Sequence, residues 1–136
     1  MVVKINEQLD KKFHSITPLY DKSRINEYTY DLNQPDTIEW ALAKSVAGEN
    51  IGYMARYTGA KFVIICGVLP LLSNSLTSQF PIVRLGALRG IYEILHAEDA
   101  SKKEMDDIII KNIKNISKND ALPEIKDYAK KILLKL

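Results

Sequence analysis

The sequence predicts an all-α fold built from paired helices, and three observations support this. In the C-terminal half, apolar residues recur at the i, i+3, i+4, i+7 spacing of a helix that buries one side. Two of these patterns open on a proline, Pro81 and Pro123, and proline is tolerated in the first turn of a helix because no hydrogen bond is lost there. The residues that follow the two prolines also resemble each other, which indicates a repeated unit.

Length and composition favour one globular domain spanning residues 1–136. Hydrophobic residues make up 46% of the chain and charged residues 26%, which are ordinary values for a folded protein. A chain of 136 residues buries enough surface to fold without a metal or a disulfide. Cys66 is the one cysteine, so no disulfide framework is expected. This cysteine usage fits a reducing compartment, and we expect a cytoplasmic protein.

Charge does not by itself indicate a nucleic-acid or membrane partner, and nucleic-acid binding stays possible. The formal net charge is +2, from 19 basic and 17 acidic residues, which is too balanced to indicate nucleic acid or a membrane surface. Most of the basic residues are Lys, which lacks the planar fork with which Arg contacts phosphates. The longest apolar run, residues 60–72, is interrupted and shorter than the ~20 residues of a membrane-spanning helix. We therefore expect no membrane span.

The N-terminal part of the chain has the weakest pattern. Residues 4–14 can form a short helix, whereas residues 16–35 combine two prolines, three tyrosines and mixed charge without a helical period. We expect an ordered loop there, so that residues 1–35 form an irregular segment packed on the domain. Residues 36–57 predict a long helix, with a bend or break near Gly48 because small residues concentrate at its middle.

The next two helices are predicted at residues 60–77 and 81–96. The first is the most apolar part of the chain, and we expect Cys66 to be buried within it as a small hydrophobe. The second is apolar nearly all round, which is typical of a helix sandwiched between neighbours. Gly86 and Gly90 lie one turn apart on it and would let another helix approach closely.

Two amphipathic helices are predicted at residues 102–117 and 122–136. Ser101 and Glu104 have the spacing of a capping box at the start of the first. In the second, Glu124 is favourably placed beside the positive end of the helix dipole. We expect the inward stripes of the last three helices to be buried, namely Val83, Ala87, Ile91, Ile109, Ile113, Ala129, Ile132 and Leu133.

The repeated unit can be aligned at an offset of 42 residues, from Pro81 to Pro123. In both copies proline is followed by a β-branched residue, a cation and an alanine at matching positions: Pro81-Ile82-Val83-Arg84-Leu85-Gly86-Ala87 and Pro123-Glu124-Ile125-Lys126-Asp127-Tyr128-Ala129. Pro35 with Ala41 and Leu42 gives a fainter third copy at an offset of 46. A spacing in this range is typical of repeats made of two helices.

With these motifs the chain resembles the HEAT-repeat family of armadillo-like α-solenoids over residues 60–136. The apolar Val68-Leu69-Pro70-Leu71-Leu72 matches the family's first helix, and the segment from Pro81 matches the opening of its second helix. The resemblance implies a short right-handed stack of antiparallel helical hairpins, a HEAT-like α-α superhelix of about two and a half repeats. It also implies a ladder of polar contacts between repeats. We expect that ladder to be incomplete, because residues 73–79 contain no acid and only Asp120 could supply one in the last unit.

No group of residues predicts catalysis, a cofactor or a metal. The two histidines, His14 and His96, lie in different segments without acidic or cysteine neighbours at ligand spacing. The acids around residues 98–107 are explained by the preference of helix N-termini for negative charge. Nothing near Cys66 would lower its pKa and activate it as a nucleophile. We therefore expect a protein that is not an enzyme.

Two surfaces are candidates for binding. Tyr and Arg are enriched at binding hot spots, and the candidate partner-binding residues are Tyr20, Arg24, Tyr28, Tyr30 and, on an apolar C-terminal face, Leu134. The tyrosines have a second interpretation, as clamps that hold a loop on the helical core. The candidate phosphate-binding residues lie on the predicted second helices: Arg84, Arg89, Lys126, Lys130 and Lys131. Interleaved acids favour the alternative that this face is salt-bridged and solvated.

The sequence therefore favours a non-enzymatic scaffold, a protein-binding or assembly module, with no cofactor. A solenoid needs about three repeats to bury its faces, so another protein or a second copy of this chain is the expected partner. The C-terminal helices are the expected place of self-association. The alternative is a HEAT-like protein that binds nucleic acid through Arg and Lys on its second helices.

Overall fold

A computed structural model describes Pro18 and residues 20–136, and the part it describes is all-helical, without a strand. The short helix expected at residues 4–14 lies outside the described residues. The α-helices are α2 (Ile25–Leu32), α3 (Ile38–Thr58), α4 (Ala60–Ile65), α5 (Val68–Ser75), α6 (Pro81–His96), α7 (Asp107–Asn119) and α8 (Pro123–Leu133). Two 3-10 turns, Lys22–Arg24 and Lys102–Glu104, precede α2 and α7.

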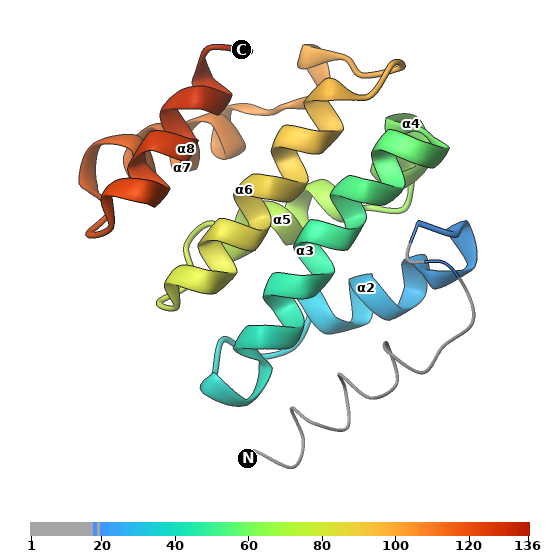
Figure 1. The fold of residues 1–136 in the computed structure, drawn as a ribbon, viewed down its shortest axis with the longest axis horizontal. Helices are drawn as coiled ribbons and strands as arrows, with labels where there is room; N and C mark the ends of the chain where they lie inside the picture. The colour runs from blue at the N-terminus through green and yellow to red at the C-terminus, as the bar shows by residue number, and fades with distance from the viewer. Residues whose placement is uncertain (1–17, 19) are drawn as a thin grey trace.

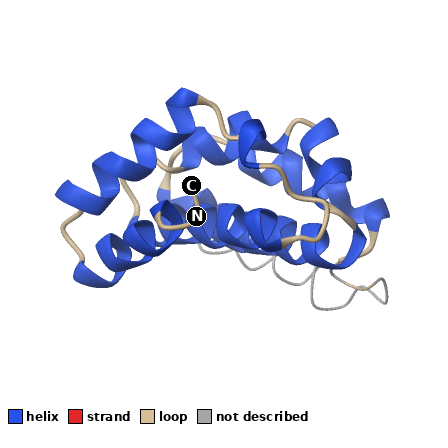
Figure 2. Ribbon diagram, turned by 90° about the horizontal axis from the view of Figure 1, so that it is seen from above, coloured by secondary structure: helices blue, strands red, loops and turns tan. Residues whose placement is uncertain are grey.

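The helices form two layers. Helices α3, α6 and α8 pack side by side in one layer, and α2, α5 and α7 pack behind them in the other. Each helix of one layer also contacts the neighbour next to it in the chain, so that the pairs are α2 with α3, α5 with α6, and α7 with α8 (Figure 1). Figure 2 shows the same arrangement after a turn of 90°. Three connecting turns, before α3, α6 and α8, therefore lie along one edge of the molecule.

Helix α2 stands where the sequence analysis expected a loop. Ile25, Tyr28 and Leu32 are buried on one side of it, at the i, i+3, i+7 spacing of an amphipathic helix. Tyr28 is fully buried and belongs to the core cluster. The expectation of an irregular segment was wrong for these residues, because a tyrosine serves as one of the three core side chains that give α2 its period.

Helix α3 is continuous from Ile38 to Thr58, so it has no break at Gly48. Its small residues serve contact with α6 instead. A Cβ added at Gly86 would lie 2.7 Å from the Cα of Ser45, and one added at Gly48 would lie 2.9 Å from the carbonyl carbon of Gly86. Ordinary contacts are longer than these distances, so the two helices touch backbone to backbone. The close approach expected at Gly86 and Gly90 is confirmed, and α3 is the partner.

Ion pairs lie across this contact between α3 and α6. Arg56 Nη1 is 3.0 Å from Glu93 Oε2, and Arg89 Nη1 is 3.3 Å from Glu49 Oε2. The hydroxyl of Tyr53 donates a hydrogen bond to Glu49. Exposed pairs of this kind contribute little to stability, and the buried glycine contact is the main link between the two helices.

The helix expected at residues 60–77 is interrupted between Ile65 and Val68. Gly67 has φ 83°, a left-handed conformation that other residues rarely adopt. The interruption also places Pro70 in the first turn of α5, where its missing N–H breaks no helical hydrogen bond. Cys66 is exposed at this corner, so the expectation that it is buried was wrong.

Aspartates cap the N-termini of two helices, α4, which follows Gly59, and α7, which follows the loop after α6. Asp99 accepts hydrogen bonds from the backbone N–H groups of Ala60 at 2.7 Å and Lys61 at 3.1 Å, at the start of α4. These bonds lower the pKa of Asp99. Asp106 accepts from the N–H of Ile109 and caps α7. The capping box expected at Ser101 was wrong, because that residue precedes a 3-10 turn and makes no capping bond.

The core runs between the two layers. Seven of the eight residues predicted to be buried are buried: Val83, Ala87, Ile91, Ile109, Ile113, Ala129 and Ile132. Leu133 is only half-buried, because it lies at the end of α8, where little of the neighbouring helices remains to cover it. The periodicity of the last three helices therefore identified the core with one exception.

Candidate functional site

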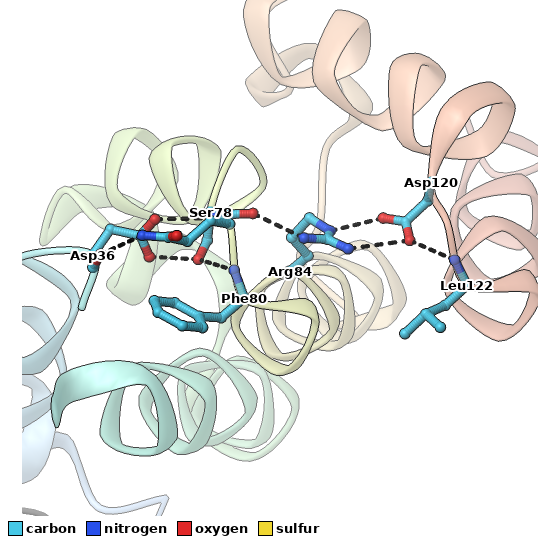
Figure 3. A network of polar contacts seen from close by, with 7 residues as sticks. Asp36, Ser78, Phe80, Arg84, Asp120 and Leu122 are labelled. Carbon is cyan, nitrogen blue, oxygen red and sulfur yellow. Dashed lines mark hydrogen bonds and ion pairs between the residues drawn. The ribbon is translucent and has the colours of Figure 1, made fainter. Parts of the chain in front are cut away.

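A polar network connects the three turns along one edge of the molecule (Figure 3). The carboxylate of Asp36, which precedes α3, accepts hydrogen bonds from the hydroxyl of Ser78 and from the N–H of Gln79 at 3.0 Å. The Ser78 hydroxyl accepts in turn from the N–H of Phe80 at 3.0 Å. The turn before α6 contains no acid of its own, and Asp36 of the preceding hairpin provides the carboxylate there.

Arg84 carries the network onward from α6 to the turn before α8. Its Nη1 donates to the carbonyl of Ser78 at 2.9 Å, and its Nε and Nη2 donate to the two oxygens of Asp120 at 2.7 and 3.2 Å. Asp120 also accepts from the N–H of Leu122 at 3.0 Å. The expectation of an incomplete set of contacts between the hairpins was wrong, because bonds from Asp36, Arg84 and Asp120 join all three turns.

The ion pair between Arg84 and Asp120 is shielded from water. The side chain of Asp120 is 2% exposed and that of Arg84 is 15% exposed. Burial raises the pKa of Asp120, but the hydrogen bonds from Arg84 and Leu122 and the charge of Lys126 outweigh it, so that the pKa lies below its ordinary value. A bidentate pair of this kind fixes geometry as well as charge.

A pocket of about 310 Å³ opens beside this ion pair. It lies between the turn after α5, the start of α6, and α7. Three asparagines of α7 line it, Asn112, Asn115 and Asn119, and the turn after α5 contributes Thr77 and Ser78. The described α5 and α7 touch at few points, and Asn112 reaches Ser73 through long hydrogen bonds of 3.3 and 3.4 Å. The space between these two helices is thus bordered by amides and hydroxyls together with three apolar side chains, Leu76, Ile116 and Ala121.

The polar groups around the pocket are suited to hydrogen bonding. Its one acid and one base, Asp120 and Arg84, are paired with each other. The lining contains no His, Cys or Lys that could act as a nucleophile or transfer a proton. Nor do the described residues contain a group of His, Cys, Asp or Glu that could hold a metal. Amides and hydroxyls can both donate and accept, which fits a polar, uncharged portion of a ligand.

The candidate partner-binding residues near the N-terminus are not one surface. Arg24 and Tyr28 are buried; Arg24 pairs with Glu27 at 2.8 Å, and burial raises the pKa of Tyr28 to about 12. Tyr20 and Tyr30 are exposed. Tyr20 stacks on Tyr57 at 4.8 Å between ring centroids, whereas Tyr30 contacts Trp40 at 6.1 Å. Arg24 and Tyr28 therefore lie within the fold, and Tyr28 belongs to helix α2 rather than to a loop.

Leu134 is 88% exposed at the end of α8. The exposed side chains of the helix itself are Pro123 and four charged residues, Glu124, Asp127, Lys130 and Lys131. The two residues expected to join Leu134 in an apolar patch, Leu85 and Tyr92, are half-buried against the core. Self-association through Leu134 stays a prediction.

The candidate phosphate-binding residues are spread over several contacts. Arg84 is held by Asp120 and Arg89 by Glu49. Lys131 lies over the ring of Tyr92 at 4.6 Å and near that of Tyr128 at 5.6 Å. Lys130 is exposed and Lys126 is half-buried near Asp120. Salt bridges thus occupy both arginines of this face; the pair of Arg89 is exposed, whereas that of Arg84 is shielded from water.

The asparagines of α7 were missed by the sequence analysis, although a signal was present. The helix contains the dipeptide Lys-Asn three times, at residues 111–112, 114–115 and 118–119. The spacing of three and four residues places the three asparagines on one side of a helix. Their role depends on the turn after α5, which lies some 40 residues earlier in the chain and which only the fold brings close.

No protein-family model matches this sequence, and no match was found among curated proteins or among solved structures. None of the helices in the described part of the chain is both long enough and apolar enough to span a bilayer.

Proposed function

We propose that the protein is a non-enzymatic protein-binding or assembly module built as a short HEAT-like stack of helical hairpins. The pairing of α2 with α3, α5 with α6 and α7 with α8 supports a stack of three units. The polar network through Asp36, Arg84 and Asp120 supports it as well, because each link joins one hairpin to the next. The fainter third copy in the sequence then corresponds to the hairpin of α2 and α3.

The main support for a binding function is the pocket of about 310 Å³ between the hairpin of α5 and α6 and the hairpin of α7 and α8. Its walls are fixed, because the buried ion pair of Arg84 and Asp120 joins the two hairpins at its base. Its lining amides and hydroxyls recognise a ligand by hydrogen bonds and supply no reactive group. A preformed site with this lining pays little ordering cost on binding.

The alternative, nucleic-acid binding through the second helices, has less support. This function requires basic side chains that are not already paired with acids. Of its five candidate residues, the two arginines pair with Asp120 and Glu49. Lysines alone would contribute a salt-dependent attraction to phosphates without the bidentate contacts that arginine makes.

The test is affinity capture from a nuclease-treated extract of the source cells, with quantitative mass spectrometry. Asn115→Arg places a long side chain in the pocket, and Asn26→Arg makes the same change at an exposed position of α2 outside the pocket. We expect one or more proteins to be captured by the wild type and by Asn26→Arg but not by Asn115→Arg. Equal capture by all three would place the binding surface elsewhere, and capture of no protein would contradict the proposed function. Recovery only without nuclease treatment would favour the nucleic-acid alternative.

A further inference from the structure

The three Lys-Asn dipeptides give α7 two parallel rows of side chains. The asparagines of the first row, Asn112, Asn115 and Asn119, line the pocket. The lysines of the second row, Lys111, Lys114 and Lys118, are exposed. Each lysine precedes its asparagine by one residue and so lies about 100° from it around the helix axis. A ligand seated against the asparagines would have the lysine row at its outer side.

Both rows have unused binding capacity. Within the described part of the chain, no hydrogen bond is made by Asn112 Oδ1, Asn115 Nδ2 or Asn119 Oδ1, while other amide atoms of these residues bond to Ser73 and to each other. Among the same residues, no ion pair involves Lys111, Lys114 or Lys118. Two acids flank the row: Asp120 is held by Arg84, and Asp107, at the start of α7, forms no ion pair with Lys111 four residues later.

The asparagine row has the chemistry and spacing of a peptide main chain. Because Asn119 Nδ2 bonds to Asn115 Oδ1, Asn115 offers its Nδ2 to a peptide carbonyl and Asn119 offers its Oδ1 to a peptide N–H. At a rise of 1.5 Å per residue, Asn115 and Asn119 are separated by about 6 Å along α7. Alternate residues of an extended chain are separated by about 6.6 Å, so two neighbouring peptide groups on one side of the chain can each face one asparagine.

The lysine row adds a preference for negative charge. Lysines on an exposed helix face attract carboxylates, and three of one sign without a paired acid give a local positive field. A single-stranded nucleic acid fits less well, because it is bound through aromatic side chains that stack on bases. Neither the pocket lining nor α7 contains an aromatic residue, and neither contains an arginine that is not already paired.

We propose that α7 and the pocket beside it bind an extended acidic polypeptide segment, with its main chain along the asparagines and its carboxylates at the lysines. This inference rests on the proposed protein-binding function and names the class of partner. It differs from the second-helix surface considered above, because α7 lies in the opposite layer from α3, α6 and α8.

The experiment measures fluorescence anisotropy of a labelled ten-residue peptide of alternating Glu and Ser, titrated with the full-length protein. A Lys-Ser peptide of equal length and a ten-residue oligothymidylate are the comparison probes. One variant replaces Lys111, Lys114 and Lys118 by Gln. Its matched control replaces Lys102, Lys103 and Lys135, three exposed lysines outside α7, and changes the net charge by the same amount. A second variant replaces Asn115 and Asn119 by Ala without a change of charge.

We expect the Glu-Ser peptide to bind, and the α7 lysine variant to weaken binding about tenfold, since each exposed charge pair contributes modestly. The matched control should change the affinity by less than about threefold, because distant exposed charges are screened. The asparagine variant should also weaken binding, and the Lys-Ser peptide should not bind.

Three results would overturn the inference. Equal weakening by the control and the α7 lysine variant would indicate only non-specific attraction. Unchanged affinity in the asparagine variant would remove the main-chain contact. Tighter binding of the oligothymidylate, lost in the same lysine variant, would make nucleic acid the partner. If the capture experiment identifies a pocket-dependent protein while the Glu-Ser peptide fails to bind, the proposed function stands and this inference fails.

Discussion

Substituting Gly86 by Ala tests the contact between α3 and α6 directly. The added Cβ would lie 2.7 Å from Cα and 2.9 Å from the carbonyl carbon of Ser45, and closer still to its carbonyl oxygen. All three atoms belong to the backbone of α3, so no side-chain rotation can relieve the overlap. The two helices must separate, and the buried residues on either side of the contact must repack.

The size of the effect follows from two opposing contributions. In an ordinary helix interior, Gly→Ala stabilises by about 0.5–1 kcal/mol, because alanine loses less backbone entropy. Overpacking of a well-filled interior costs about 1–3 kcal/mol. A backbone overlap belongs at the upper end of that range, so we expect a net loss of about 2 kcal/mol in the free energy of unfolding.

The assay is urea denaturation followed by circular dichroism at 222 nm, with the midpoint and the slope compared between variants. Ile82→Ala serves as the control, because Ile82 is an exposed residue of the same helix. A surface substitution of this kind should change stability by less than about 0.5 kcal/mol. A Gly86→Ala protein as stable as the wild type, or more stable, would refute the close contact of the two backbones.

Three further predictions follow from the core, the ion pair and the C-terminus. Ile132 is fully buried, and Ile132→Ala should cost about 2–5 kcal/mol in urea denaturation; a loss below about 0.5 kcal/mol would show that its side of α8 faces water. Because the folded-state pKa of Asp120 is depressed, its ionisation stabilises the fold above the unfolded pKa and is lost as pH falls through the folded value. The stability gap between the wild type and Asp120→Asn should therefore narrow between about pH 5 and pH 2 in thermal melts, and a pH-independent gap would argue against the pairing with Arg84. Self-association through Leu134 predicts sedimentation faster than a monomer at high concentration and a monomer value for Leu134→Lys; a monomeric wild type would contradict it.

Local signals predicted the second half of the fold well. Helix α6 begins and ends as expected, because Pro81 fixes its first turn and the apolar stripe continues to His96. Helix α7 was predicted about one turn too early, because Ser101 and Glu104 have the spacing of a cap, while Asp106 makes the capping bond instead. Ser101 and Asp106 are both residues that favour a helix N-cap position. The helix that starts after Asp106 places Ile109 in the core.

The N-terminal hairpin and the pocket were harder to predict for a different reason. Helix α2 has a proper period at Ile25, Tyr28 and Leu32, but it is short and is stabilised by packing on α3 rather than by its own sequence. Arg84 was recognised as a candidate site residue, yet its partner Asp120 lies 36 residues away. Contacts over such separations are set by how the hairpins stack, which local patterns do not specify.

The interrupted helix at Gly67 has a practical consequence for studying the protein in solution. It exposes Cys66, the sole thiol of the sequence, at the corner between α4 and α5. A maleimide dye can therefore be attached to the unaltered protein at one position. The pocket begins at the other end of α5, about 12 Å along the helix axis, near enough for the dye to respond to ligand binding by fluorescence and far enough not to fill the site. The wild-type chain thus supplies its own spectroscopic reporter.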